Sequence, residues 1–208
     1  MDNFPKKIAV FPLSGVIFFP ETNLPLNIFE SRYLKMVNDT LKNNKFLGMI
    51  QSKNVNGDVY NVGCLGKIDE HNRTEDGRIL INLKGINRFQ IDKEIQNNEP
   101  YREFYVKYDL FKDDTNKKEI KVADEKLNEL INNSKIFFKK NSILINWSEL
   151  SKLSVQKQIY NLAMISPISV EEKQKLIEIV KLDNVANILN EITKFNFYEN
   201  SEQKKILQ

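Results

Sequence analysis

IAVFPLSGVIFFPETNLPLNIFESRYLKMVNDTL, residues 8–41, contains two apolar runs, three spaced prolines and a segment whose apolar residues recur at helical spacing. Ile8–Phe11 and Val16–Phe19 are rich in β-branched and aromatic residues, and a proline follows each. Because proline lacks the backbone N–H that a strand ladder needs, this pattern predicts two short strands that end at the prolines. Leu24–Phe29 continues as a third extended segment. The stretch is too short to bury its own apolar side chains, so later residues must complete the core.

A helix is predicted from Glu30 to about Asn43. Its inward side is apolar and its outward side is polar, as expected of a helix on the surface of a domain. The apolar residues at this spacing are Tyr33, Leu34, Val37 and Leu41.

Further strands are predicted downstream, at Phe46–Ile50, Val59–Glu70, Arg78–Ile91 and Phe104–Tyr108. The pair Asp76-Gly77 supplies the positive φ angle that a tight hairpin requires. Gly85 interrupts the alternation of the second hairpin arm, which predicts a bend or a bulge. About six short strands favour a closed or nearly closed β-barrel, because closure removes exposed strand edges.

The second half of the chain predicts helices. The first is a long amphipathic helix whose apolar residues include Ile120, Leu130 and Phe138. Later helices are predicted at Val155–Ile165, at Val170–Ile179 and after Asp183. Ser169, followed three residues later by glutamate, matches a capping box, which marks where the third helix starts.

Lys112–Lys118 is a polar run that contains no apolar residue. It predicts a boundary between a β-barrel subdomain, residues 1–111 with one helix near residues 30–43, and a helical subdomain, residues 119–197. Residues 198–208 are expected to form a frayed tail. The predicted fold class is therefore α+β, a β-barrel followed by a helical bundle.

Composition excludes several classes of protein. The 208 residues include 31 basic and 28 acidic residues, mixed along the chain, and the net charge is only +3. This mixing lacks the segregated basic stripe typical of a nucleic-acid surface. The mean hydropathy is −0.46, and no apolar run approaches the roughly 20 residues of a membrane span. The N-terminus lacks the order of a signal peptide, so we expect a cytoplasmic protein.

Residues that support catalysis or metal binding are few. His71 is the only histidine, and its place near the hairpin turn predicts a solvated loop residue. Cys64 is the only cysteine, which excludes an intrachain disulfide and a cysteine metal cluster. The paired carboxylates of Asp113-Asp114 and Glu171-Glu172 are interpreted as parts of a polar linker and of a helix start. We therefore predict no catalytic residue, no cofactor and no metal.

Residues that could contact a partner are concentrated in the first half of the chain. Glu30, Arg32 and Tyr33 lie at a strand-to-helix junction, where they either fix the helix against the barrel or meet a ligand. Arg88 carries the same two alternatives. Aromatic residues exceed what the barrel core needs, and those left exposed would form a protein-binding patch. These aromatic residues are Phe18, Phe19, Phe29, Tyr101, Tyr105 and Tyr108.

Three blocks of the sequence together resemble one known family. They are FPLSGVIFFP with LPLNIFESRYLKMV, residues 11–20 and 24–37; VGCLGKIDEHNRTEDGRILINLKGINRFQI, residues 62–91; and SPISVEEKQKLIEI, residues 166–179. Their order and content are similar to the N-terminal substrate-binding domain of Lon protease, also called the ATP-dependent protease La domain. One departure is Glu21, where many relatives carry glycine, and it affects the local turn.

The resemblance implies a PUA-like β-barrel with a helical bundle, a module that captures polypeptides without enzymatic activity. Gly66-Lys67 is followed by Ile68, and Asn61 stands where a Walker A motif has its first glycine, so no phosphate-binding loop is expected. We predict a stand-alone relative that lacks ATPase and protease domains and binds unfolded polypeptide or a protein partner in a groove between barrel and helices. An RNA-binding PUA-like protein is the alternative. The sequence predicts no oligomeric state.

Overall fold

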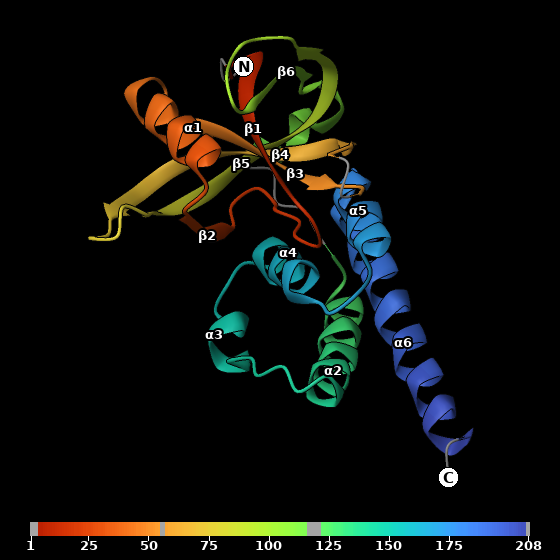
Figure 1. The fold of residues 1–208 in the computed structure, drawn as a ribbon. Coiled ribbons are helices and arrows are strands. Elements are labelled where there is room, and N and C mark those ends of the chain that lie inside the picture. Colours follow the sequence, from red (N-terminus) through yellow and green to blue (C-terminus); the bar gives the residue numbers. More distant parts are fainter. Residues whose placement is uncertain (1–3, 55–56, 116–121, 207–208) are drawn as a thin grey trace. The chain divides into compact units, whose positions relative to one another are not determined.

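The computed structural model describes residues 4–54, 57–115 and 122–206, with side chains up to residue 196 (Figure 1). The chain divides into two compact units, Met1–Lys117 and Lys118–Gln208. The first contains the strands and the second is helical, which confirms the predicted α+β class.

Six strands form the sheet of the first unit. They are β1 (Lys7–Leu13), β2 (Asn23–Ile28), β3 (Phe46–Ser52), β4 (Val59–Arg73), β5 (Ile79–Ile95) and β6 (Arg102–Lys107). The sheet order is β2-β5-β4-β3-β1-β6, and β6 also pairs with β5. The β1–β3 pair is parallel and the other pairs are antiparallel. The additional β5–β6 pairing therefore links β5, β4, β3, β1 and β6 into a ring.

Strand β5 belongs to two parts of this sheet. Its first half, Ile79–Lys84, pairs with β2, and its last residues, Gln90–Ile95, pair with β6. The register against β4 shifts beside Gly85, which confirms the predicted bulge. At Gly85 an added Cβ would lie 2.0 Å from the Phe19 carbonyl oxygen. Only glycine allows this close approach between β5 and the segment before β2.

The predicted strand Val16–Phe19 is wrong. Ile17, Phe18 and Phe19 are buried, but the segment has no strand pairing. The Phe19 carbonyl instead accepts a hydrogen bond of 2.6 Å from the Thr22 hydroxyl. The outer edge of β5 is occupied by β2, so this apolar segment fills the core without joining the ladder. A buried run has the same composition in either case, which explains the error.

Pro12 also behaves differently from the prediction, because β1 continues through it to Leu13. The pairing of β1 with β6 ends at Val10, so Pro12 has a partner strand, β3, on one side only. A proline is tolerated where its missing N–H faces no ladder partner.

The core of the ring is formed by buried side chains from every one of its strands. Its residues are Ile8, Val10, Ile50, Leu65, Phe89, Phe104 and Val106. Helix α1 (Ser31–Lys42) follows β2, and its buried residues include Tyr33, Met36 and Val37. After β6 the chain forms a short 3-10 helix, η1 (Asp109–Thr115), which overlaps the first residues of the predicted polar run Lys112–Lys118.

The second unit contains α2 (Asp124–Lys140), α3 (Trp147–Ser151), α4 (Val155–Ile165), α5 (Val170–Glu178) and α6 (Leu182–Ile206). Helix α4 has the predicted bounds, and the capping box at the start of α5 is present. The short helix α3 was not predicted, since five residues leave too little periodicity. The backbone of α6 continues into the predicted tail, and Ile120 lies outside the described residues. Within the described part of the chain, no helix is both long and apolar enough to span a membrane.

Candidate functional site

Three of the sequence-predicted partner residues lie in the core. Phe18, Phe19 and Arg88 are exposed by 1%, 0% and 1%. Arg88 donates hydrogen bonds of 2.9 and 2.7 Å to the two carboxylate oxygens of Asp114, and its guanidinium lies 4.4 Å from the Phe111 ring centroid. The pair joins β5 to η1 and leaves neither charge facing solvent. We therefore leave these three residues out of the proposed binding surface.

The contact between Arg88 and Asp114 also corrects how Asp113-Asp114 was interpreted from the sequence. Asp113-Asp114 was interpreted as part of a polar linker, but the Asp114 side chain is only 6% exposed and pairs with a core arginine. It accepts a further hydrogen bond of 2.9 Å from the backbone N–H of Arg88. Asp114 lies 26 residues from Arg88 in the sequence. No local sequence pattern predicts this pair, because the topology of the sheet decides which distant residues meet.

The other three predicted residues stay together at the start of α1. Arg32 donates a hydrogen bond of 2.9 Å from Nε to Glu30, and both side chains are about half exposed. The Arg32 guanidinium lies 4.4 Å from the Tyr33 ring centroid, within cation–π range. Tyr33 itself is buried and packs edge-on against Phe11 at 4.3 Å between centroids. Tyr33 therefore anchors the helix, while Arg32 lies at the surface above it.

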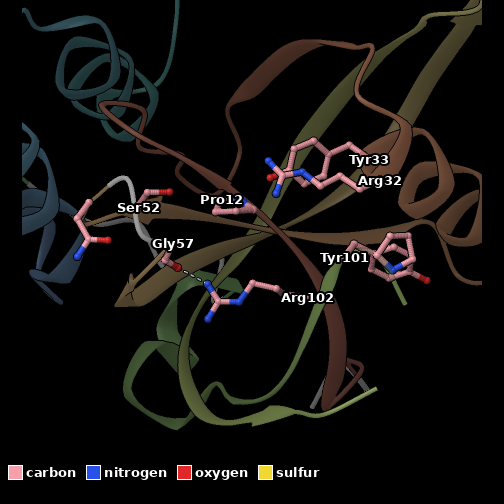
Figure 2. A pocket seen from close by; sticks show the side chains of 9 residues that line it. Pro12, Arg32, Tyr33, Ser52, Gly57, Tyr101 and Arg102 are labelled. Carbon is pink, nitrogen blue, oxygen red and sulfur yellow. Dashed lines mark hydrogen bonds between the residues drawn. The ribbon is translucent and has the colours of Figure 1, made fainter. Parts of the chain in front are cut away.

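Arg32 and Tyr33 also line a pocket of about 220 Å³ in the first unit (Figure 2). The other lining residues come from β1, the end of β3 and the connection to β4, and the β5–β6 connection with the first residue of β6. They are Pro12, Ser52, Asn54, Gly57, Pro100, Tyr101 and Arg102. The pocket thus collects two tyrosines, two arginines and two prolines, and none of its described lining residues carries a carboxylate.

The arginine of β6 is fixed by its neighbours. Arg102 donates hydrogen bonds of 2.6 and 2.7 Å to the two carboxylate oxygens of Glu94, and these bonds lower the pKa of Glu94. It also donates to the carbonyl of Gly57, the contact drawn as a dashed line in Figure 2. The charges of Arg102 and Arg32 are therefore both balanced by carboxylates outside the pocket. The pocket offers rings and guanidinium faces rather than a strong positive field.

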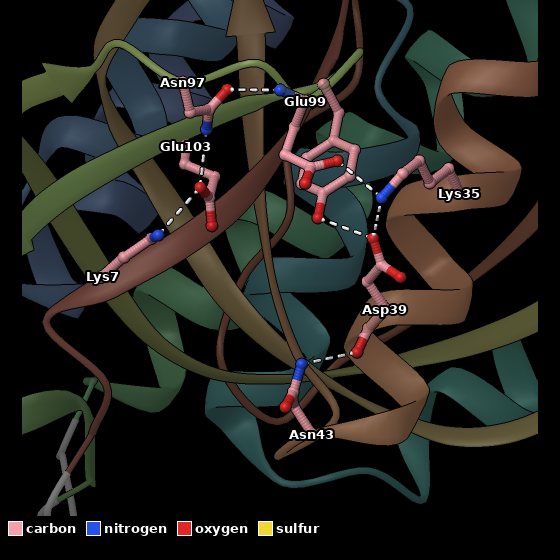
Figure 3. A network of polar contacts seen from close by, with 8 residues as sticks. Lys7, Lys35, Asp39, Asn43, Asn97, Glu99 and Glu103 are labelled. Atoms are coloured by element: carbon pink, nitrogen blue, oxygen red, sulfur yellow. Dashed lines mark hydrogen bonds and ion pairs between the residues drawn. The ribbon is translucent and has the colours of Figure 1, made fainter.

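Tyr101, which lines the pocket, is held by a polar network with Lys35 and Asp39 on α1. Figure 3 shows these two residues and Glu99 joined by dashed contacts. The Tyr101 hydroxyl donates a hydrogen bond of 3.0 Å to Asp39 on α1, and burial together with this carboxylate raises the pKa of Tyr101 to about 12. Lys35 forms ion pairs of 2.7 Å with Asp39 and 2.6 Å with Glu99. The hydrogen bond from Lys35 lowers the pKa of Asp39. The network ties α1 to the β5–β6 connection and orients the Tyr101 ring.

His71 and Cys64, the residues considered for catalysis or metal binding, do not line this pocket. His71 is exposed near the end of β4. Cys64 is fully buried, and burial raises the pKa of its thiol well above the usual value. Among the described residues, no group of three or more histidine, cysteine, aspartate or glutamate side chains is arranged to hold a metal ion.

The first unit thus combines a ring of strands with a small pocket, and the second unit is helical. Residues 7–194 match the model of the ATP-dependent protease La (LON) substrate-binding domain, and the chain belongs to this family. This family match favours a substrate-binding role over the RNA-binding alternative.

Two solved structures share the fold. The N-terminal domain of the Mycobacterium avium complex Lon protease aligns with a TM-score of 0.64 and 15% identity, covering 91% of this chain and 98% of that one. The Lon N-terminal domain protein from Xanthomonas campestris gives a TM-score of 0.62 and 18% identity over 88% of this chain and 96% of that one. These identities are low, so the likeness concerns the fold.

Curated sequence relatives include proteins named Lon protease. The chain is 27% identical to the Lon protease of Malacoplasma penetrans over 193 residues, which are 83% of this chain and 23% of the relative. It is 26% identical to that of Cytophaga hutchinsonii over 137 residues, which are 62% of this chain and 16% of the relative. The chain therefore spans less than a quarter of the length of these relatives.

Sequence reasoning found part of the pocket. Arg32 and Tyr33 were predicted as partner residues, and Tyr101 was counted among the surplus aromatics. Arg102 was missed, although it directly follows Tyr101 at the start of a strand. The convergence of β1, α1 and β6 at one place depends on the β1–β6 pairing, which the sequence pattern does not specify.

Proposed function

We propose that the chain captures segments of other polypeptides, and that one side chain of each segment enters the pocket beside Arg32 and Tyr101. The observation that carries the proposal is the lining of this pocket in a member of a substrate-binding family. Tyrosine and arginine are enriched at the residues that dominate protein–protein binding energies. A volume of about 220 Å³ is below the roughly 300 Å³ at which pockets for small ligands begin. It suits a single side chain of a longer chain.

The paired charges favour a polypeptide over a nucleic acid. The carboxylates of Glu30 and Glu94 already occupy the guanidinium groups of Arg32 and Arg102. A phosphate approaching either guanidinium group would be repelled by the carboxylate already paired with it, or would have to displace that carboxylate. Both cost free energy. An aromatic or aliphatic side chain instead stacks on the rings and guanidinium faces without disturbing the ion pairs.

The lining is also ordered before any ligand binds. Tyr33 is buried against Phe11, and Tyr101 is held by its hydrogen bond to Asp39. Side chains that are already fixed lose little conformational entropy on binding. The pocket therefore retains more of its contact energy as affinity than a set of mobile surface residues would.

The proposal is tested by the binding of a fluorescently labelled, reduced and alkylated model protein, followed by fluorescence anisotropy. We expect binding in the micromolar range. Ser52→Phe places a ring in the pocket and should weaken binding by about tenfold, equivalent to about 1.4 kcal/mol. Arg32→Ala removes one wall and should weaken binding less, by about threefold.

Arg78→Ala is the matched control for Arg32→Ala. Arg78 is also half exposed, pairs with a nearby carboxylate, Asp76, and lies over an aromatic ring, Phe29. It does not line the pocket, so its loss should leave the affinity unchanged. Equal affinities for wild type and Ser52→Phe would exclude the pocket as the site. The whole proposal fails if the protein ignores unfolded chains while a defined small molecule raises its melting temperature.

A further inference from the structure

A second recess lies within the helical unit, lined by residues at the end of α2 and in the loop that leads into α3. Figure 1 shows the course of these two helices and of the loop between them. Its volume is about 440 Å³. The side chains that matter for its chemistry are Lys135, Phe138, Lys139, Leu144, Ile145 and Trp147. We call this recess the α2–α3 groove.

The floor of the α2–α3 groove is apolar. The rings of Phe138 and Trp147 stack with their centroids 6.0 Å apart and their planes at 24°. Phe138 is only 1% exposed and supports the Trp147 ring, whereas Leu144 in the loop beside them is 99% exposed. Large apolar side chains gathered around a recess mark a surface that a partner covers.

The rim of the groove is positively charged. Between Glu129 and Glu149 the sequence holds the three lysines Lys135, Lys139 and Lys140 and no carboxylate. The ammonium group of Lys135 lies 5.7 Å from the Trp147 ring centroid. Among the described side chains, neither Lys135 nor Lys139 forms an ion pair.

Other lysines of the same unit differ from these two. Lys126 pairs with Asp183 at 2.8 Å, and Lys152 pairs with Glu149 at 2.6 Å. Lys194 pairs with Glu129 on the neighbouring helix. Ion pairs are therefore common in this unit, whereas Lys135 and Lys139 have none among the described side chains.

We propose that the α2–α3 groove docks an acidic and apolar segment of a partner polypeptide. A leucine or phenylalanine of the segment packs on Leu144, Ile145 and Trp147, and flanking aspartate or glutamate side chains pair with Lys135 and Lys139. Charge complementarity gives the groove its selectivity, while the apolar floor supplies most of the affinity. This site goes beyond the proposed function, because it lies in the other unit and selects segments by charge.

The only tryptophan of the chain reports on this groove directly, because Trp147 lies in its wall. The probe is a short synthetic peptide of leucine and glutamate, and the matched probe carries lysine in place of each glutamate. We expect the acidic peptide to shift the Trp147 emission in a saturable way, with an affinity at least about tenfold above that of the basic peptide. Raised salt should weaken the acidic peptide's binding.

The double variant Lys135→Glu with Lys139→Glu should reverse this preference and bind the basic peptide more tightly. The control is Lys175→Glu with Lys181→Glu, which makes the same change in net charge away from the groove and should keep the wild-type preference. Equal binding of the two peptides, or equal effects of the two double variants, overturns the proposal. So does an emission shift on concentrating the protein alone, which would show that a second copy occupies the groove. Binding of the unfolded model protein to the Ser52→Phe variant is measured separately, so the two proposals fail independently.

Discussion

Residues far apart in the sequence hold the strand unit together, whereas each helix of the second unit is defined by residues within a few positions of its start. Lys7 on β1 lies opposite Tyr105 on β6, and Arg88 pairs with Asp114. In the second unit, by contrast, Ser169 and Glu172 cap α5 through two hydrogen bonds three residues apart in sequence. The comparison teaches that single substitutions should be most damaging where they break a non-local contact in the strand unit.

The largest expected effect is that of Asp114→Asn. It removes the carboxylate from a guanidinium that is only 1% exposed, and an uncompensated buried charge typically costs about 3–5 kcal/mol. Urea unfolding should show this loss as a lower midpoint. The neighbouring substitution Asp113→Asn, at an exposed residue, should cost less than about 1 kcal/mol. Equal losses for the two variants would contradict the role of the buried pair.

Gly85→Ala should come next, with a loss of about 1–3 kcal/mol from overpacking. The new methyl group would lie 2.0 Å from the Phe19 carbonyl oxygen, so either β5 or the segment before β2 that contains Phe19 must shift. Gly15→Ala is the comparison within the same unit, because nothing lies within 4 Å of its added Cβ and only its φ of +72° is unfavourable. We expect about 1 kcal/mol there. A smaller loss at Gly85 than at Gly15, measured by thermal unfolding, would refute the close approach.

The local contacts of the helical unit should give smaller effects. Ser169→Ala removes the side chain that accepts a 3.1 Å hydrogen bond from Glu172 N–H, which costs about 1 kcal/mol. Ser154→Ala at the start of α4 removes a longer bond of 3.4 Å without a capping box, and should cost about half as much. Helical circular dichroism during thermal unfolding measures both. A greater cost at Ser154 would count against the capping box.

The smallest expected effect is an increase in the free energy of unfolding. Glu21 has φ of +59° in the strand unit, and a left-handed conformation disfavours any residue with a Cβ. Glu21→Gly should stabilise the protein by a few tenths of a kcal/mol, since the relief of strain exceeds the added chain entropy of glycine by about that much. Glu21→Ala keeps the Cβ and should give no gain. Stabilisation by alanine equal to that by glycine would show that strain is not the cause.

The difference between local and non-local contacts also explains which features could be predicted from the sequence. The bounds of α4 and the capping box of α5 were predicted because the signals for helix starts and stops lie next to the helices themselves. The hairpin and the bulge at Gly85 were predicted for the same reason, from turn residues. Val16–Phe19 was assigned wrongly because its burial is visible in the sequence but its lack of a strand partner is not.

The candidate site follows the same rule. Arg32 and Tyr33 were recognised together because they are neighbours at a helix start. Arg102 joins them through strand pairing across the ring, and Arg88 was explained only by a residue beyond β6. Contacts of this kind arise from topology, which composition and periodicity do not encode.

The pairing of the first strand with the last has a consequence for the order in which the protein is made. A ribosome releases β1 long before β6, yet β1 needs Arg102–Tyr105 to cover one of its edges. Asp114, the partner of a core arginine, emerges later still. The ring therefore cannot close until nearly all of its unit has been synthesised, and its apolar strands face the crowded cell until then. Helices of the second unit meet no such delay, because the residues that start each one emerge together.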